Sequence, residues 1–154
     1  MGVLVQFQKK GGFRQLLLIF ELTEPAKQKN LFHLVATEDP GWAHLLRIKM
    51  LTFERVCQWP TPALKQVLSP LPAPLLGHLH GLATASQRHS LEKALPPRAL
   101  RELKEWLNQN TPNPNDAWFA QIKLVQGIRE MESLGLFSPA EVDPTLELDQ
   151  RLVS

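Results

Sequence analysis

The sequence has a single cysteine, little net charge and no long apolar run. Cys57 has no second cysteine to pair with, so an intramolecular disulfide is impossible and a reducing compartment is favoured. The 17 basic and 15 acidic residues leave a formal net charge of +2, without the basic excess typical of nucleic-acid-binding proteins. The longest apolar runs, residues 16–20 and 134–137, are far shorter than the roughly 20 residues that a membrane span needs.

Signals for export and for catalysis are also missing. Residues 1–7 are apolar but few, and Lys9 and Lys10 follow them, whereas in a secretory signal peptide the basic residues come first. No phosphate-binding loop, dinucleotide-binding glycine motif or GxSxG motif is present. We therefore expect a soluble cytoplasmic protein with no cofactor, no enzymatic activity and no direct membrane insertion.

The five histidines and the cysteine do not form a recognisable metal or catalytic set. His78 and His80 are two residues apart, which would place them on nearly opposite sides of a helix. There is no HExxH motif and no cysteine cluster. We interpret the histidines as surface or half-buried residues. Cys57, between Val56 and Trp59, is interpreted as a small core residue rather than a nucleophile.

The sequence contains thirteen prolines, and most of them stand where helices are expected to begin. Proline suits the first helical turn, because an N–H group there has no intrahelical partner. Helix starts are predicted at Pro40, Pro62 and Pro97, with Asp39 and Thr61 as the N-cap residues of the first two. The longest helix is predicted to have Asp116 as its N-cap and Gly135 just after its end.

Apolar residues recur at helical spacing between these breaks. Leu100, Leu103 and Leu107 follow an i, i+3, i+7 pattern, and residues 117–134 contain a similar stripe. Alternation typical of strands is weak and confined to residues 3–7. We therefore expect an all-α stack or bundle of short helices joined by short turns. The predicted helices are 13–22, 26–37, 41–50, 53–58, 62–69, 74–82, 85–95, 97–109 and 116–134.

Charge is unevenly distributed along the chain. Residues 1–110 contain 14 Lys and Arg against 8 Asp and Glu, whereas residues 111–154 contain 3 against 7. A mildly basic body with an acidic end suits contacts with proteins better than contacts with a phosphate backbone. We expect residues 137–154 to form an acidic, partly mobile tail.

The helix that begins at Pro97 has the one organised set of charges. The charged residues on its face away from the leucine stripe are Arg98, Arg101, Glu102 and Glu105. Two interpretations remain open: an ordinary solvated helix face with i,i+4 ion pairs, or a mixed-charge ridge that binds a partner of complementary charge. Trp106, beside the leucine stripe, is either a core residue or, if exposed, an anchor for a partner.

A sequence pattern in the first third of the chain resembles that of a known family. The segment EDPGWA at residues 38–43 is followed by Met50, Leu51, Phe53 and Glu54. This is similar to the C-terminal region of the flagellar motor switch protein FliG. There, an acidic pair and a proline precede a helix that ends in a Met-Phe-x-Phe motif followed by an acid. In this chain a leucine replaces the first phenylalanine.

The register of this resemblance extends without a gap in both directions. Gly11 and Gly12 fall on the family's Gly-Gly linker. Further residues at matching positions are Ala83, Arg88, Leu91, Arg98 and Ala99. The closing helix resembles the family's last helix with one residue missing. The resemblance covers residues 11–136.

The resemblance implies an armadillo-like helical lobe over residues 11–50 and a six-helix lobe over residues 51–136. It also implies hinges, whose residues are Gly11, Gly12, Met50, Leu51, Thr52 and Phe53. In the family, the first lobe packs against the middle domain of a neighbouring subunit. A charged ridge on the second lobe meets the cytoplasmic loop of the stator and takes up torque. The implied function is a rotor module that binds switch components and the stator at the inner-membrane base of the flagellum.

The ridge of this chain departs from the family pattern. Arg98 and Glu105 match two of the five charges, but Gly81, Trp106 and Pro114 occupy the positions of a lysine, an acid and an arginine. The resemblance does not include the family's N-terminal and middle domains, so we expect either a fragment or a divergent relative. An alternative is therefore a divergent adaptor that binds the subunits of a flagellar or another assembly without generating torque.

Overall fold

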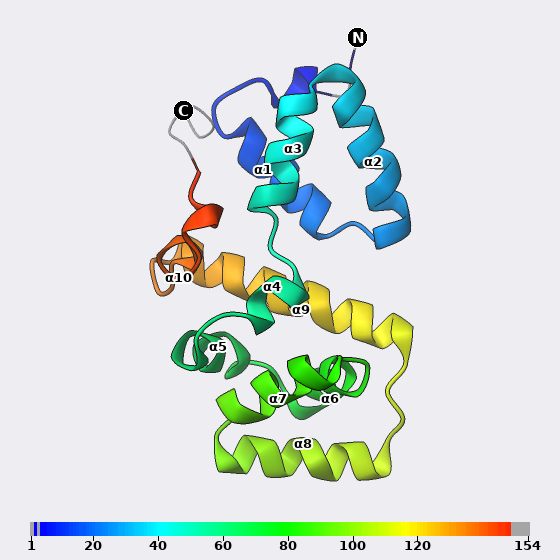
Figure 1. Cartoon of the computed structure of the whole chain (residues 1–154), viewed down its shortest axis with the longest axis vertical. Helices are drawn as coiled ribbons and strands as arrows, with labels where there is room; N and C mark the ends of the chain where they lie inside the picture. Colours follow the sequence, from blue (N-terminus) through cyan, green and yellow to red (C-terminus); the bar gives the residue numbers. More distant parts are fainter. Residues whose placement is uncertain (1, 3, 149–154) are drawn as a thin grey trace. The chain divides into compact units, whose positions relative to one another are not determined.

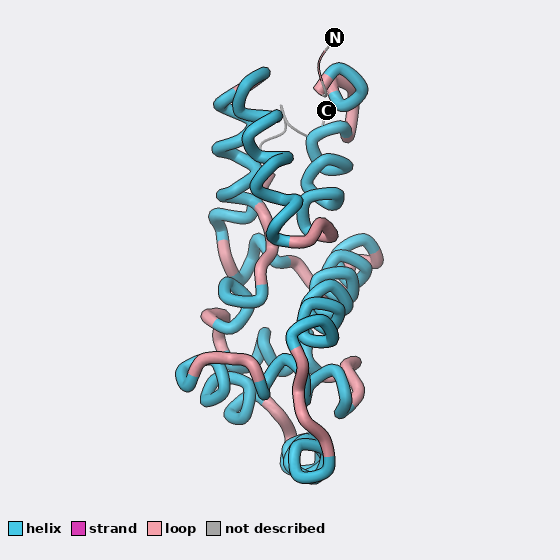
Figure 2. Tube along the Cα trace, turned by 90° about the vertical axis from the view of Figure 1, so that its right-hand side faces the viewer, coloured by secondary structure: helices cyan, strands magenta, loops and turns pink. Residues whose placement is uncertain are grey.

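The structure is a computed structural model that describes residue 2 and residues 4–148 (Figures 1 and 2). Over these residues it contains α-helices and 3-10 helices (η) and no strand, so the all-α prediction is confirmed. The elements in chain order are η1 (Val5–Phe7), α1 (Gly12–Glu21), α2 (Pro25–Glu38), α3 (Pro40–Lys49), α4 (Phe53–Cys57), α5 (Thr61–Leu68), α6 (Ala73–Gly81), α7 (Ala85–Ala94), α8 (Pro97–Gln109), α9 (Pro114–Ser133), α10 (Pro139–Val142) and η2 (Pro144–Leu146).

The chain divides into two compact units. The first unit contains the residues up to Leu51 together with the segment from Asp143 onward, and the second unit spans Thr52–Val142. The boundary lies one residue after the position expected from the sequence. The segment expected to be a tail is divided between the units at residue 143.

Residues 143–148 pack against the rest of the first unit. Leu146 is only 6% exposed, and Leu148 packs against the apolar cluster of the first unit. The Lys49 ammonium donates a hydrogen bond of 2.7 Å to the Thr145 carbonyl. The two leucines hold this acidic segment on the first unit, because each apolar side chain is stabilised by removal from water, while Pro144, Thr145 and Glu147 stay exposed. Residues 149–154 of the expected tail lie outside the described residues.

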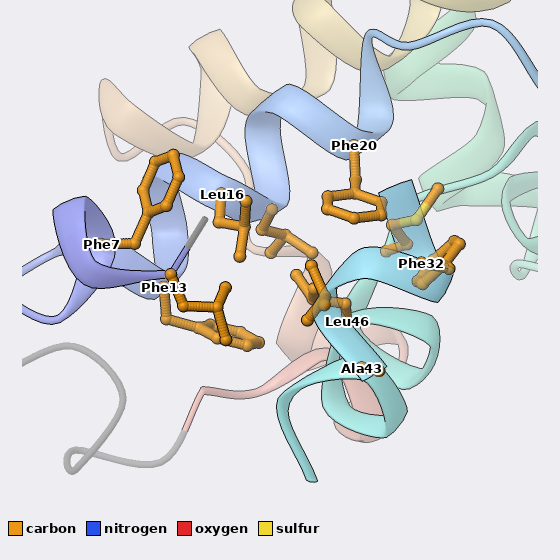
Figure 3. Packing of buried hydrophobic residues seen from close by; sticks show 11 residues of the cluster. Phe7, Phe13, Leu16, Phe20, Phe32, Ala43 and Leu46 are labelled. Carbon is orange, nitrogen blue, oxygen red and sulfur yellow. The ribbon is translucent and has the colours of Figure 1, made fainter. Parts of the chain in front are cut away.

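The core of the first unit is formed by apolar side chains from α1, α2 and α3 (Figure 3). On α1, Phe13, Leu16, Leu17 and Phe20 follow helical spacing and are all at most 3% exposed. Figure 3 shows that Phe20 and Phe32 lie beside each other, and their ring centroids are 4.5 Å apart. Such aromatic pairs add to the stabilisation from burial alone.

The second unit is built around contacts of α6 with α8 and α9 and of α5 with α7. Each of these five helices contributes buried leucines or an isoleucine. The fully buried members are Leu64, Leu68, Leu79, Leu91, Leu103, Leu124 and Ile128. Beyond the C-terminal end of α9, the ring centroid of Phe137 lies 5.6 Å from that of Trp59. Residues 137–142 therefore extend the packing of this unit.

Two of the predicted helix-end signals are confirmed. Asp39 is the N-cap residue of α3, and its Oδ1 accepts a hydrogen bond of 3.1 Å from the Trp42 N–H. Gly135 has φ +72° and follows α9, where its N–H donates to the Glu132 carbonyl. The Leu136 N–H donates to the Met131 carbonyl at 2.9 Å. These two bonds form a Schellman motif.

Two predicted N-caps are wrong. Helix α9 begins at Pro114, and its N-cap residue is Asn113, whose Oδ1 accepts a hydrogen bond of 2.9 Å from the Asp116 N–H. Asn113 and Pro114 together supply the cap and the fixed φ that start a helix, so the start lies before Asp116. Helix α5 already includes Thr61, because Pro60 is the residue at its N-cap.

Candidate protein-binding ridge and hinge

All four charges predicted for the ridge are exposed on α8. The residues are Arg98, Arg101, Glu102 and Glu105, and we refer to them as the charged ridge. The opposite side of the helix buries Leu103, which is 1% exposed, while Leu100 and Leu107 are half-buried. The leucine stripe therefore orients α8, and the charged ridge faces solvent.

One ion pair lies within the charged ridge. Arg98 Nε donates to Glu102 Oε1 over 3.2 Å, with side chains that are 87% and 52% exposed. A pair this exposed stabilises a helix by only a few tenths of a kcal/mol. Both groups therefore remain available to a partner of complementary charge.

The order of charges on α8 is not explained by helix stability. Arg98 and Arg101 lie toward the N-terminus, and no acid stands in the first turn and no base in the last. The helix macrodipole favours the opposite arrangement, with acids first and bases last. An Arg that precedes its Glu partner by four residues is also the weaker orientation of such a pair. The order of these charges therefore contributes little to the stability of α8.

The Trp106 side chain of α8 packs against α6. Its side chain is half-buried, and a Cβ placed on Gly77 would lie 2.1 Å from the Trp106 Cε3 atom. The indole also meets the His78 ring edge-on, with centroids 4.8 Å apart. The indole thus occupies space that only a glycine at position 77 leaves open. Of the two interpretations of Trp106, internal packing is the one that its contacts favour.

Gly81 and Pro114 are also used for packing. A Cβ on Gly81 would lie 2.0 Å from Pro112 Cγ, so the loop before α9 approaches this end of α6 closely. Pro114 is the first residue of α9. Neither position presents a charge, and the exposed charges singled out from the sequence are confined to α8.

The histidines of α6 contact two different neighbours. His78 accepts a hydrogen bond of 3.4 Å from the Asn113 N–H and lies 3.8 Å from Asp116. His80 Nε2 lies 3.3 Å from Glu92 Oε1. Both side chains are 13% exposed, in agreement with the half-buried interpretation. Throughout residue 2 and residues 4–148, no three His, Cys, Asp or Glu side chains converge as metal ligands would.

Cys57 lies at the end of α4 and is buried. Burial, together with the nearby Glu54 carboxylate, raises the pKa of the thiol to about 12. The thiolate is the reactive form of cysteine, and this environment suppresses it. The interpretation of Cys57 as a core residue agrees with its burial.

Gly11 and Gly12 are explained by the local backbone where η1 meets α1. Gly11 has φ +76°, which L side chains rarely adopt. A Cβ on Gly12 would lie 1.7 Å from the Phe7 carbonyl oxygen. Both glycines are therefore required by this tight junction.

Hydrogen bonds to α1, α3 and α4 fix parts of the second predicted hinge, which has four residues. They are Met50, Leu51, Thr52 and Phe53. The Met50 N–H donates to the Leu46 carbonyl at the end of α3. The Leu51 N–H donates over 2.7 Å to Glu21 Oε2, and Thr52 Oγ1 accepts from the Arg55 N–H at 3.1 Å. The boundary between the units falls between Leu51 and Thr52.

Glu21 is the residue of this region that the sequence did not single out. It is 4% exposed, at the C-terminal end of α1. Its one sequence signal is its position beside Leu17 and Phe20 on the apolar stripe of that helix. Periodicity predicts that such a position is buried, but it does not identify the group that a buried carboxylate binds.

No helix of the described chain is long and apolar enough to cross a membrane.

Comparisons with known proteins point to the flagellar motor switch protein FliG. Residues 33–138 match the family model of the FliG C-terminal domain. Among solved structures, FliG of H. pylori (residues 116–343) shares 19% identity and a TM-score of 0.53, over 83% of this chain and 57% of that one. A longer H. pylori FliG fragment (residues 86–343) shares 18% identity and a TM-score of 0.59, over 85% of this chain and 62% of that one.

At these identities the likeness to the solved structures concerns the fold alone. The chain spans about three fifths of the length of the two H. pylori fragments. No curated protein matches the chain.

Proposed function

Since the chain belongs to the FliG C-terminal domain family, we propose that it is a flagellar rotor module that binds other motor proteins through the charged ridge of α8. The observation that supports this most is the order of charges along α8. The exposed charges of this helix are, in order, Arg98, Arg101, Glu102, Lys104 and Glu105. The two arginines lie nearest its N-terminus, no acid stands in the first turn and no base in the last, which is the order that the helix macrodipole disfavours. A partner with complementary charges compensates that arrangement, and the cytoplasmic loop of the stator is the partner that the family provides.

The two units have separate roles in this proposal. The armadillo-like part, residues 11–50, docks with switch components, and the six-helix part, residues 51–136, presents the charged ridge. The linker Met50–Phe53 connects them and lets the second unit reorient. The support for this division is that the boundary between the two compact units falls between Leu51 and Thr52, within the linker.

A second candidate is a FliG-like adaptor that binds protein partners without taking up torque. Gly81 and Trp106, which stand at two ridge positions of the family, are occupied by internal packing. Charge is thereby confined to one helix, and a contact with fewer charges is weaker and more sensitive to salt.

The two candidates are distinguished by the binding of a purified stator cytoplasmic loop to the chain, measured by biolayer interferometry at low and physiological salt. We expect the double charge reversal R98E/E105R to weaken binding at least tenfold, about 1.4 kcal/mol, because each reversed side chain repels the charge it attracted. The net charge of the chain does not change.

The matched control is E24K/K27E, a double reversal of exposed residues in the first unit. It is expected to bind the loop as the unmodified chain does. Binding that survives R98E/E105R would contradict a role of the charged ridge. If the unmodified chain does not bind the loop, the adaptor becomes the better candidate.

A further inference from the structure

We propose that Glu21 acts as a latch that fixes Leu51 to the first unit, so that the movable part of the linker Met50–Phe53 is limited to the backbone torsions of Leu51 and Thr52. The inference deepens the hinge of the proposed function and rests on it. Four residues were expected to form that hinge, and the hydrogen bonds around them limit the movable backbone to Leu51 and Thr52.

The first argument is the burial of the Glu21 carboxylate. Glu21 is 4% exposed, and it stands alone as a charged residue among the buried residues of the described chain. Burying a carboxylate is unfavourable unless hydrogen bonds compensate for the lost water. An apolar residue would fill the same place on the stripe of α1 without that cost. The Leu51 N–H donates a hydrogen bond of 2.7 Å to Glu21 Oε2, and this bond compensates part of the cost of burying the carboxylate.

The second argument is the way in which the chain leaves α3. Met50 is extended, with φ −65° and ψ 135°, and its N–H still donates to the Leu46 carbonyl. The following residue, Leu51, is 2% exposed and is held by Glu21. Both residues before the boundary are therefore bound to the first unit through their backbone N–H groups.

The third argument is the way in which the chain enters α4. Thr52 is the N-cap residue of that helix, with its Oγ1 bonded to the Arg55 N–H and its carbonyl accepting from the Val56 N–H at 3.0 Å. Thr52 therefore moves with the second unit. The backbone torsions left between the Leu51 N–H and the Thr52 carbonyl are φ and ψ of Leu51 and φ and ψ of Thr52. Hinges generally consist of a few such torsions that absorb the whole change.

The latch has a mechanical consequence. With Glu21 in place, the flexible part of the linker is short. The second chain connection between the units, from Val142 to Asp143, is the same with and without Glu21. Without Glu21, Leu51 is released and the linker lengthens toward Met50, so the second unit samples a wider range of orientations.

The test is a distance distribution between spin labels in the two units, measured by double electron–electron resonance on the full chain. Labels are attached at K29C on α2 and K104C on α8, both of which are exposed positions. Cys57 is buried and does not compete for the reagent. We expect the distribution of E21A to be at least one and a half times as wide as that of the unmodified chain.

Two variants serve as controls. E24A removes an exposed glutamate whose side chain makes no cap bond, and it is expected to leave the distribution unchanged. E21Q keeps an acceptor oxygen and is expected to stay close to the unmodified chain. A distribution for E21A that coincides with the unmodified one would overturn the latch.

Hydrogen exchange at the Leu51 amide, followed by NMR, separates a latch from general support of the first unit. In E21A, we expect the Leu51 amide to exchange at least tenfold faster while the amides of Phe20 and Leu46 keep their rates. An equal acceleration of all three would overturn the latch. E21A leaves the charged ridge intact, so it is expected to bind the stator loop normally. The latch can therefore fail while the proposed function stands, and the reverse also holds.

Discussion

At the scale of single residues, Cys57 shows most clearly how burial changes chemistry. Its thiol lies in the core of the second unit, and burial is the larger cause that raises its pKa to about 12, with the Glu54 carboxylate as the smaller one. Neutral thiol is therefore retained in the folded chain at pH values where an unfolded chain would ionise it. The single cysteine stabilises the fold as a neutral apolar group.

This environment predicts a pH dependence of stability. The pKa of the thiol is raised on folding from 9.0 to about 12, so its contribution is fully present below pH 9 and is lost as the pH rises from 9 toward 12. The free energy of unfolding should fall by about 1.4 kcal/mol per pH unit in that interval on account of this group. Denaturant unfolding of the unmodified chain and of C57A, compared between pH 8 and 10.5, isolates the contribution of the thiol to the free energy of unfolding. Parallel curves for the two proteins would contradict it.

Glu21 illustrates a limit of prediction at this scale. The charged ridge was predicted from periodicity, because an exposed helix face is defined by its own sequence. Glu21 was not, because its role depends on Leu51, thirty residues away. The same applies to Trp106, whose burial depends on a glycine in another helix.

At the scale of elements, the predicted helices all occur, with ends within two residues of those observed. Proline starts and apolar spacing are local signals, which explains this agreement. The short elements η1, α10 and η2 were not predicted, since three or four residues are too few to show a period. Which helices pack together was not predictable from the sequence pattern either.

The packing of α6 against α8 gives a prediction at Gly77. Gly77→Ala should destabilise the second unit by about 1–3 kcal/mol, because the added Cβ would collide with the Trp106 ring. In the W106A background the same substitution should cost much less, since the ring is absent. A double-mutant cycle of thermal or denaturant unfolding measures this coupling.

Gly127 is the matched control for that cycle. It lies in α9, and nothing stands within 4 Å of the Cβ it would gain. Gly127→Ala is expected to be neutral or to stabilise the chain by up to about 1 kcal/mol, because alanine is the better helix former. Equal effects of Ala at positions 77 and 127 would show that the close approach to Trp106 has no energetic consequence.

At the scale of the whole molecule, the chain is a member of the FliG C-terminal domain family with two compact units. The armadillo-like and six-helix division expected from the resemblance places the linker at Met50–Phe53, where the unit boundary lies. The placement of residues 143–148 with the first unit was not foreseen, because it depends on contacts between segments distant in sequence.

The proposed function is tested most directly by affinity capture of the tagged chain from cells that assemble their own flagella, with the captured proteins identified by mass spectrometry. The account predicts that switch or stator proteins are recovered, and that stator recovery falls at least tenfold with R98E/E105R but not with E24K/K27E. Recovery of an unrelated set of proteins without any flagellar component would contradict it, and would mean that the chain keeps the family's fold but serves another assembly.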